Sequence, residues 1–336
     1  MKVILIFGGA SPEHEVSIRS AKTIYDALLT HHEVLCAYIT KEDVWMRVES
    51  PEKLESGIEL NYDIPTQTWL YGEESFKIDI AFPIVHGVGG EDGILQNKLA
   101  LWGIKFVGTP AEESELCFDK RATKEVLRGV DVDVVEEIIL LHPTDAPTFT
   151  DATKQVSGDV LFVKPSRSGS SVGVHKVKNQ EELNLAIEDA FKYDVEVLIE
   201  RAVSSPRELE VAILETSPGV FEASEPGEIV PDDEFYSYDA KYAESSQSRT
   251  EVNPKLPDEL RQQLKNVAIK VNDALGCRGL VRVDFLYDGN RKILYLNEVN
   301  TLPGFTSISM YPMLWANSGY DINALVDKLV VVAAES

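Results

Sequence analysis

Two runs of strand-forming residues near the C-terminus carry side chains suited to chemistry. The first run contains Arg282 and Asp284, and the second contains Glu298 and Asn300. An Asp-Gly pair at residues 288–289 separates the runs and predicts a hairpin. Because side chains alternate between the two faces of a strand, folding the hairpin brings Asp284 near Glu298, within a residue or two of register. The sequence therefore predicts two carboxylates, an amide oxygen and a guanidinium on one patch of sheet.

Two unpaired carboxylates held side by side would repel each other and lose their hydration. A divalent cation between them relieves both costs, and oxygen ligands that leave room for phosphate and water suit Mg²⁺. The alternative is a solvated hairpin face with a surface Asp–Arg pair. A Pro-Gly turn at residues 303–304 would present backbone amides beside the cation, which favours the metal site.

A second stretch, residues 160–174, has the composition of an anion-binding loop. A strand-like run ends in Lys164, and the loop after it contains Ser170, Ser171 and two glycines. Small residues let consecutive N–H groups converge on an anion, and the lysine adds a point charge. The stretch is not a Walker loop, because it lacks Gly-Lys-Ser/Thr and no helix follows. A merely flexible hairpin is the alternative.

The next strand-like run, residues 195–203, ends in a polar hinge. Its backbone N–H and C=O groups could hold an adenine, and Glu208 beyond the hinge could accept ribose hydroxyls. For Glu200 and Glu208, the alternative is an ordinary strand-end carboxylate.

Two glycine-rich loops in the N-terminal third each follow a strand-like run, one at residues 8–9 and one at residues 86–93. Ligands of open α/β sheets bind beyond the carboxyl ends of strands, where both loops must lie. The first turn lacks G-x-G-x-x-G, which argues against a dinucleotide-dependent oxidoreductase. Glu13 stands at the start of the next helix. It could bind a ligand, or it could simply stabilise the helix, because a carboxylate interacts favourably with the positive end of the helix dipole.

The spacing of apolar residues along the rest of the chain predicts its helices and strands. Strands are expected at 1–7, 34–39, 78–85, 134–141, 160–164 and 195–203, and helices at 13–29, 94–102, 119–128, 180–193, 257–275 and 322–332. A domain boundary is expected at 109–113, an irregular peripheral excursion at 42–76, a surface connection at 142–150 and a polar lid at about 224–256.

Length and composition narrow the classes of protein. A chain of 336 residues with 44% hydrophobic and 26% charged residues suits a soluble protein of two or three domains. A net charge of −24 argues against nucleic acid or an anionic membrane as a partner. No apolar run approaches the ~18 residues of a membrane span, so a cytoplasmic protein is expected. The three cysteines show no paired spacing and are expected to be buried and inert.

Taken together, these stretches resemble the ATP-grasp enzymes and, among them, the D-alanine–D-alanine ligases. The resemblance covers nearly the whole chain. It rests on Gly8-Gly9-x-Ser11-x-Glu13-x-Glu15, His86-Gly87-x-x-Gly90-Glu91-Asp92-Gly93, Asp119-Lys120, Lys164-Pro165-Ser166-Arg167-x-Gly169-Ser170-Ser171, Tyr238-x-x-Lys241-Tyr242, Arg282-x-Asp284 and Glu298-x-Asn300-Thr301-x-Pro303-Gly304.

The resemblance implies an α/β fold, with α+β character in the ATP-binding part, in a three-domain ATP-grasp architecture. An N-terminal Rossmann-like domain would span residues 1–112, a central subdomain 113–206, and a C-terminal subdomain with the lid 207–336. The resemblance also implies a homodimer, with ATP and D-alanine as substrates, two Mg²⁺ (or Mn²⁺) ions and a monovalent cation such as K⁺.

The residues matching the family's motifs acquire expected roles. The metal ligands would be Asp284, Glu298 and Asn300. The ATP site would contain Lys120, Lys164, Ser170, Ser171, Glu200, Arg201, Val203, Glu208, Lys241 and Asn297. Glu13, His86, Arg282, Gly304 and Ser309 would bind D-alanine, and Glu13, Ser170, Tyr242 and Arg282 would be the catalytic set. Arg201 departs from the family's pattern, because many relatives carry lysine there.

The implied chemistry explains why the site needs these groups. A carboxylate is a poor acyl donor, so ATP would first convert D-alanine to an acyl phosphate, which the amine of a second D-alanine attacks.

Ligases making D-alanyl-D-lactate or D-alanyl-D-serine remain alternatives. Tyrosine at 242 favours the dipeptide, because relatives making D-alanyl-D-lactate generally carry phenylalanine there. A non-catalytic ATP-binding regulator is a remote alternative, since no metal ligand or loop lysine is missing.

Overall fold

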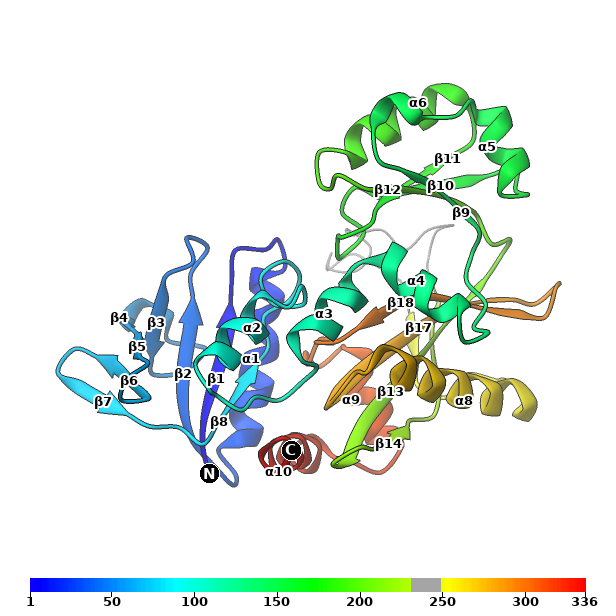
Figure 1. The fold of residues 1–336 in the computed structure, drawn as a ribbon. Coiled ribbons are helices and arrows are strands. Elements are labelled where there is room, and N and C mark those ends of the chain that lie inside the picture. The colour runs from blue at the N-terminus through cyan, green and yellow to red at the C-terminus, as the bar shows by residue number, and fades with distance from the viewer. Residues whose placement is uncertain (231–248) are drawn as a thin grey trace.

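The computed structural model describes residues 1–230 and 249–336. The N-terminal elements lie at the left of Figure 1 in blue and cyan, the middle of the chain lies at the upper right in green, and the C-terminal elements lie below it in yellow to red. Part of the predicted lid falls between the two described ranges. The domain limits at residues 112 and 206 stay predictions.

The N-terminal elements form a sheet with helices on both faces. They include the parallel strands β1 (Lys2–Gly8), β2 (Glu33–Ile39) and β8 (Ile80–Pro83) and the helices α1 (His14–Leu28) and α2 (Ile94–Leu101). Residues 3–7 of β1 are fully buried. Val3, Leu5 and Phe7 pack on the α1 side, and Ile4 and Ile6 pack on the α2 side. A continuously apolar strand is typical of a sheet covered on both faces, so the predicted strand–turn–helix opening is confirmed.

The prediction that residues 42–76 are irregular is wrong. The stretch contains β3 (Trp45–Val48), the 3₁₀ turn η1 (Leu54–Ser56), β4 (Ile58–Glu59), β5 (Asn61–Asp63), β6 (Thr68–Tyr71) and β7 (Glu74–Phe76). Strands β3 and β4 extend the edge of the main sheet, while β5, β6 and β7 form a separate small sheet. The rings of Trp45, Tyr62, Trp69 and Trp102 pack with centroids 4.9 to 5.8 Å apart. These few large rings bury enough surface to order an otherwise polar stretch.

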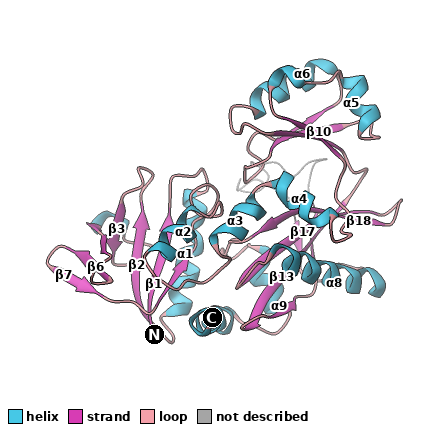
Figure 2. Ribbon diagram, in the orientation of Figure 1, coloured by secondary structure: helices cyan, strands magenta, loops and turns pink. Residues whose placement is uncertain are grey.

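The middle of the chain forms an antiparallel sheet with helices on its outer side (Figure 2). The elements are β9 (Glu137–Leu140), η2 (Pro143–Asp145), α5 (Phe149–Gln155), β10 (Leu161–Pro165), β11 (His175–Val177), α6 (Gln180–Ala190) and β12 (Val197–Arg201). The strand order is β11-β10-β12-β9. The sequence pattern missed α5, a short helix whose Thr148 cap accepts a hydrogen bond from the N–H of Asp151. For α6 the cap was predicted, and Asn179 accepts from the N–H of Glu182 at 3.0 Å.

The C-terminal elements surround a six-stranded sheet of order β16-β15-β13-β17-β18, with β14 beside β13. The strands are β13 (Arg207–Ser217), β14 (Val220–Ala223), β15 (Gly227–Val230), β16 (Arg249–Glu251), β17 (Leu280–Asp288) and β18 (Ile293–Asn300). The helices are α3 (Ala111–Phe118), α4 (Lys120–Arg128), α8 (Asp258–Leu275), α9 (Met310–Asn317) and α10 (Ile322–Glu335). Because β15 and β16 belong to this sheet, the ends of the predicted lid are part of the fold.

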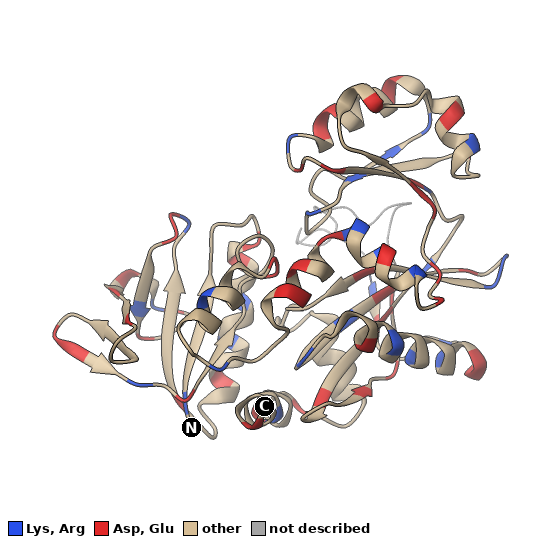
Figure 3. Ribbon diagram, viewed as in Figure 1, with Lys and Arg blue, Asp and Glu red and all other residues tan. Residues whose placement is uncertain are grey.

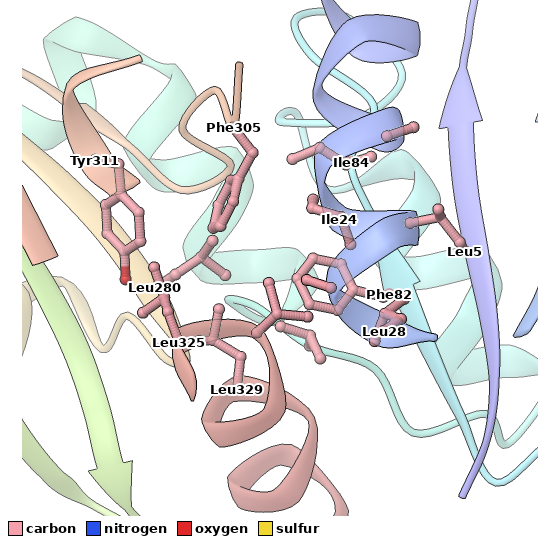
Figure 4. Close-up of a cluster of buried hydrophobic side chains, with 14 of the residues drawn as sticks. Leu5, Ile24, Leu28, Phe82, Ile84, Leu280, Phe305, Tyr311, Leu325 and Leu329 are labelled. Carbon is pink, nitrogen blue, oxygen red and sulfur yellow. The ribbon is translucent and has the colours of Figure 1, made fainter. Parts of the chain in front are cut away.

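One hydrophobic core joins the first and last parts of the chain (Figure 4). Ile24 and Leu28 of α1 and Phe82 of β8 face Leu325 and Leu329 of α10 across this core. All five side chains are 1% exposed or less. The sheet that carries the hairpin is therefore fixed against the sheet that carries the two glycine-rich loops.

Charged residues are spread over all parts of the ribbon (Figure 3). Acidic side chains outnumber basic ones by 56 to 32. Within the two described ranges, every helix is too short or too polar to cross a lipid bilayer.

The three cysteines are buried, as predicted. The Sγ atoms of Cys117 and Cys277 lie 3.4 Å apart, a proximity that their spacing of 160 residues did not reveal.

Candidate active site

The hairpin of β17 and β18 gathers its polar side chains as the sequence predicts. Arg282 pairs with Asn300 across the two strands, and Asp284 pairs with Glu298. The Asn300 amide donates a hydrogen bond to Asp284 Oδ2 at 2.9 Å. Cross-strand partners share one face of a sheet, so all four side chains lie on one patch.

A one-residue bulge lies beside this patch. After the pair of Asp284 with Glu298, the ladder continues with Phe285 opposite Leu296, so Asn297 is the extra residue. Neighbouring strand residues normally point to opposite faces, yet Asn297 and Glu298 both line the same cavity. The bulge explains how the hairpin can offer both residues to one ligand.

Arg282 forms the cationic centre of the patch. Its Nε and Nη2 donate to the two oxygens of Asp284 at 2.8 and 2.7 Å. Its Nε also lies 3.0 Å from Glu210, which pairs with Asp284 from the neighbouring strand β13. Burial alone would lower the pKa of Arg282, but the adjacent Asp284 and Glu210 carboxylates raise it well above its usual value. The guanidinium is therefore held in a fixed orientation and always charged.

Glu13 lies at the start of α1, against the serine loop that follows β10. The Ser170 hydroxyl donates to Glu13 Oε1 at 2.5 Å, joining two segments 157 residues apart. Gly87 must be glycine here, since its φ is +70° and a Cβ would lie 2.9 Å from Glu13 Oε2. These contacts fix a carboxylate at the edge of the cavity, where it can accept an ammonium group.

His86 lies beneath this carboxylate and is only 3% exposed. Its Nδ1 donates to the Leu302 carbonyl at 3.0 Å, and its Nε2 lies 3.1 Å from the Ser20 hydroxyl. Burial alone would lower the pKa of His86, but the nearby Glu91 and Glu13 carboxylates and the Leu302 carbonyl raise it overall. His86 thus links α1, the second glycine-rich loop and the turn after β18, and it can present positive charge to a carboxylate.

Lys120 is the predicted phosphate contact that lines the cavity directly. It begins α4, and its Nζ donates to the Ser168 carbonyl at 2.6 Å. Burial lowers the pKa of Lys120, against the opposing effect of the Glu298 carboxylate.

Ser170 and Ser171, in the serine loop, have φ values of +50° and +61°. Left-handed backbone at a non-glycine residue costs on the order of 1 kcal/mol, so the serine loop holds an unfavourable shape next to the lysine.

The predicted adenosine residues are divided between two places. Glu208 lines the cavity, while Glu200, Arg201 and Val203 are absent from its described lining and lie in the middle sheet and its hinge. The Arg201 guanidinium donates to Glu136 at 2.6 Å and lies 4.9 Å from the ring centre of Tyr295. Val203 packs beside Tyr295 in a small cluster. Lys164 and Ser171 are likewise absent from the described cavity lining.

Gly304 and Ser309 lie in the turn between β18 and α9. The Ser309 hydroxyl accepts from the N–H of Thr306 at 3.0 Å. A Cβ at Gly304 would lie 2.7 Å from that hydroxyl, so glycine lets the turn close around Ser309. Both residues line the cavity. Lys241 and Tyr242 lie outside the described residues.

The cavity has a volume of about 600 Å³, within the range of ordinary ligand sites. Its described lining contains six carboxyl groups and three Lys or Arg side chains, besides His86. The carboxylates belong to Glu13, Glu91, Glu208, Glu210, Asp284 and Glu298, and the cations to Arg19, Lys120 and Arg282. A triphosphate would be repelled by this excess of negative charge unless divalent cations entered with it.

The predicted metal ligands fit Mg²⁺ in their chemistry. Asp284, Glu298 and Asn300 offer only oxygen ligands, and two of them are carboxylates on paired strand positions. Within the described ranges no three His, Cys, Asp or Glu side chains already form a metal cluster. The metal site is therefore supported by the two carboxylates and the amide, and by the excess of negative charge in the surrounding cavity lining.

Three charged residues of the described lining, Glu91, Glu210 and Arg19, were given no role by the sequence interpretation. Glu91 was visible in the glycine-rich loop at residues 86–93. Glu210 holds Arg282, and its position two residues after Glu208 on one strand could have revealed it, because the two side chains share a face. Arg19 lines the cavity from α1. Glu15, one helical turn earlier, is not part of the described lining, so helical spacing gave no signal for Arg19.

Comparisons with known proteins agree with this geometry. The sequence profile of the D-ala D-ala ligase N-terminus matches residues 2–109, and that of the D-ala D-ala ligase C-terminus matches residues 127–331. A D-alanine--D-alanine ligase of Clostridium acetobutylicum is 41% identical over 99% of this chain and 98% of its own. A D-alanine--D-alanine ligase A of Chromobacterium violaceum is 40% identical over 100% of this chain and 95% of its own.

Solved structures show the same similarity. D-alanyl-alanine synthetase A from Vibrio cholerae superposes with a TM-score of 0.89 at 33% identity, covering 100% of this chain and 99% of the other. The VanG D-Ala:D-Ser ligase from Enterococcus faecalis superposes with a TM-score of 0.87 at 29% identity, covering 99% of both chains. The α/β fold that the resemblance implied is confirmed. The chain belongs to the D-ala D-ala ligase family.

Proposed function

We propose that this enzyme uses ATP to join two molecules of D-alanine into D-alanyl-D-alanine, a precursor of peptidoglycan. The observation that carries the proposal is the fixed Arg282–Asp284–Glu298–Asn300 patch, which shares one cavity with Glu13. Family membership and the names of the similar proteins support the same substrate. The ATP requirement favours a cytoplasmic enzyme, and the family resemblance favours a homodimer.

Each side chain has a defined task in this reaction. Glu13 accepts hydrogen bonds from the ammonium group of the first D-alanine, and His86 balances its carboxylate. Lys120 contacts the ATP phosphates, and the serine loop encloses them with N–H groups. Arg282 stabilises the oxyanion that forms when the second amine attacks the acyl phosphate. Ser309 binds the second D-alanine.

Asp284, Glu298 and Asn300 would hold two Mg²⁺ ions, for which Mn²⁺ could substitute. The ions would neutralise charge on the phosphates during transfer. A monovalent cation such as K⁺ is also proposed from the resemblance.

Purified protein should release ADP only when ATP, Mg²⁺ and D-alanine are all present, and mass spectrometry should identify D-alanyl-D-alanine. Parallel reactions with D-lactate or D-serine as the acceptor define the second substrate. No ADP release with any of the three would refute the ligase function. Preferential formation of D-alanyl-D-serine would favour the second candidate, which the similarity to the VanG ligase supports.

Tyr242, outside the described residues, is expected to affect acceptor choice. Tyr242→Phe should shift part of the activity from D-alanine to D-lactate, because ligases making D-alanyl-D-lactate generally carry phenylalanine at this lid position. The measurement is the ratio of kcat/KM for the two acceptors at one pH. An unchanged ratio would contradict a role for Tyr242 in acceptor choice.

A further inference from the structure

Lys124 is a buried lysine that no role described above uses. Its residue is 2% exposed, and it lies on α4 one helical turn after Lys120. Its Nζ donates to the Val135 carbonyl at 3.1 Å, to Glu137 Oε2 at 2.8 Å and to Glu200 Oε1. An ammonium group has three donors, so this side chain is fully satisfied.

Glu200 joins Lys124 to the predicted phosphate site. Its other oxygen, Oε2, lies 2.8 Å from the Nζ of Lys164. Both lysines and Glu200 are less than 9% exposed at the side chain. Burial alone would raise the pKa of Glu200, but Lys124 and Lys164 lower it to about 2. Glu200 is therefore a permanent anion with one lysine on each oxygen.

This arrangement gives Glu200 a different task from the one expected at the adenosine site. Both of its oxygens already bind lysines, so its main partner in the site is Lys164. Lys164 is the last residue but one of β10, close to the serine loop, where its long side chain needs a fixed anchor to act as a phosphate contact. Glu200 supplies that anchor, and Lys124 fixes Glu200.

We infer that Lys124 is a positioning residue for ATP binding, which orients Glu200 and through it holds the Lys164 ammonium group toward the phosphates. The inference rests on the proposed use of ATP. Lys124 also has a second branch, because Glu137 binds both Lys124 and, at 2.6 Å, Arg128. The side chain of Glu137 binds Lys124 and Arg128 and no predicted site residue directly, so Glu137 provides a control.

The test compares variants that each remove one charge. Lys124→Gln should raise the KM for MgATP about tenfold and leave the KM for D-alanine unchanged. A change of about tenfold is the usual size of the coupling between residues in one ion-pair network. Glu137→Gln should leave the KM for MgATP within about twofold of wild type, because it breaks only the second branch. The double variant Lys124→Gln/Glu200→Gln should bind MgATP no more weakly than Glu200→Gln alone, because Lys124 acts through Glu200.

The outcomes separate a positioning role from a structural one. An unchanged KM for MgATP in Lys124→Gln, equal effects of Lys124→Gln and Glu137→Gln, or additive losses in the double variant would each overturn the inference. A Lys124→Gln protein that fails to fold would overturn it too, because Lys124 would then serve stability first. Wild-type protein that does not use ATP would instead refute the proposed function.

Discussion

Glu298→Gln is expected to lower kcat by on the order of a thousandfold, the scale of electrostatic stabilisation in active sites. Glu298 pairs with Asp284 in a cavity whose lining has six carboxyl groups and three Lys or Arg side chains. The substitution removes one negative ligand oxygen while keeping the shape of the side chain. We therefore expect the Mg²⁺ concentration for half-maximal activity to rise as well.

Glu222→Gln is the matched control, because Glu222 is exposed on β14 of the same sheet. That variant should keep wild-type activity and wild-type dependence on Mg²⁺. Thermal unfolding of both variants checks that the sheet is intact. If Glu298→Gln keeps its Mg²⁺ dependence and its kcat stays within about tenfold of wild type, Glu298 is not a metal ligand.

Arg282→Lys should reduce dipeptide formation by about a hundredfold or more, as removal of one oxyanion donor does in other enzymes. Lysine keeps the positive charge beside Asp284 but loses the planar pair of donors, at 2.8 and 2.7 Å, that fixes the side chain. A point charge on a flexible stem stabilises an oxyanion less well, so kcat should fall while the KM for MgATP changes little.

Isotope scrambling within [γ-¹⁸O]ATP, measured beside dipeptide formation in the same D-alanine reaction, reports acyl phosphate formation separately. Scrambling by Arg282→Lys should be reduced less than dipeptide formation, because the guanidinium acts on the carbonyl under attack. Dipeptide formation within about threefold of wild type would show that charge alone suffices at this position.

The hairpin was predictable because local rules determine it. The Asp-Gly pair marks where the chain folds back, and alternation puts Arg282 with Asp284, and Glu298 with Asn300, on one face of each strand. The exact register was not given by the turn, because Asp288 pairs with Ile293 and residues 289–292 form a longer loop, which together with the bulge places Asp284 opposite Glu298. The bulge at Asn297 was not predictable, since no local pattern requires an extra residue there. Helix α9 was missed because Pro312 interrupts a short segment, although a proline in the first turn of a helix is tolerated.

The ion-pair network around Lys124 escaped prediction for another reason. Its members come from α4, β9, β10 and β12, which are separated in sequence, and each looks like an ordinary charged residue in its own element. Only tertiary packing shows that Glu200 is shared between two lysines. The same holds for the 42–76 stretch, where Trp69 and Trp102 contact each other across 33 positions.

The core shared by α1 and α10 bears on how the protein is made. During synthesis α1 leaves the ribosome long before its partners Leu325 and Leu329, because most of the described chain lies between them. Until then, Ile24, Leu28 and Phe82 lack the surface that covers them in the finished molecule. The apolar side chains of the N-terminal sheet and α1 therefore stay exposed to water until α10 has been synthesised. Such exposed apolar surface on a nascent chain is what chaperones bind.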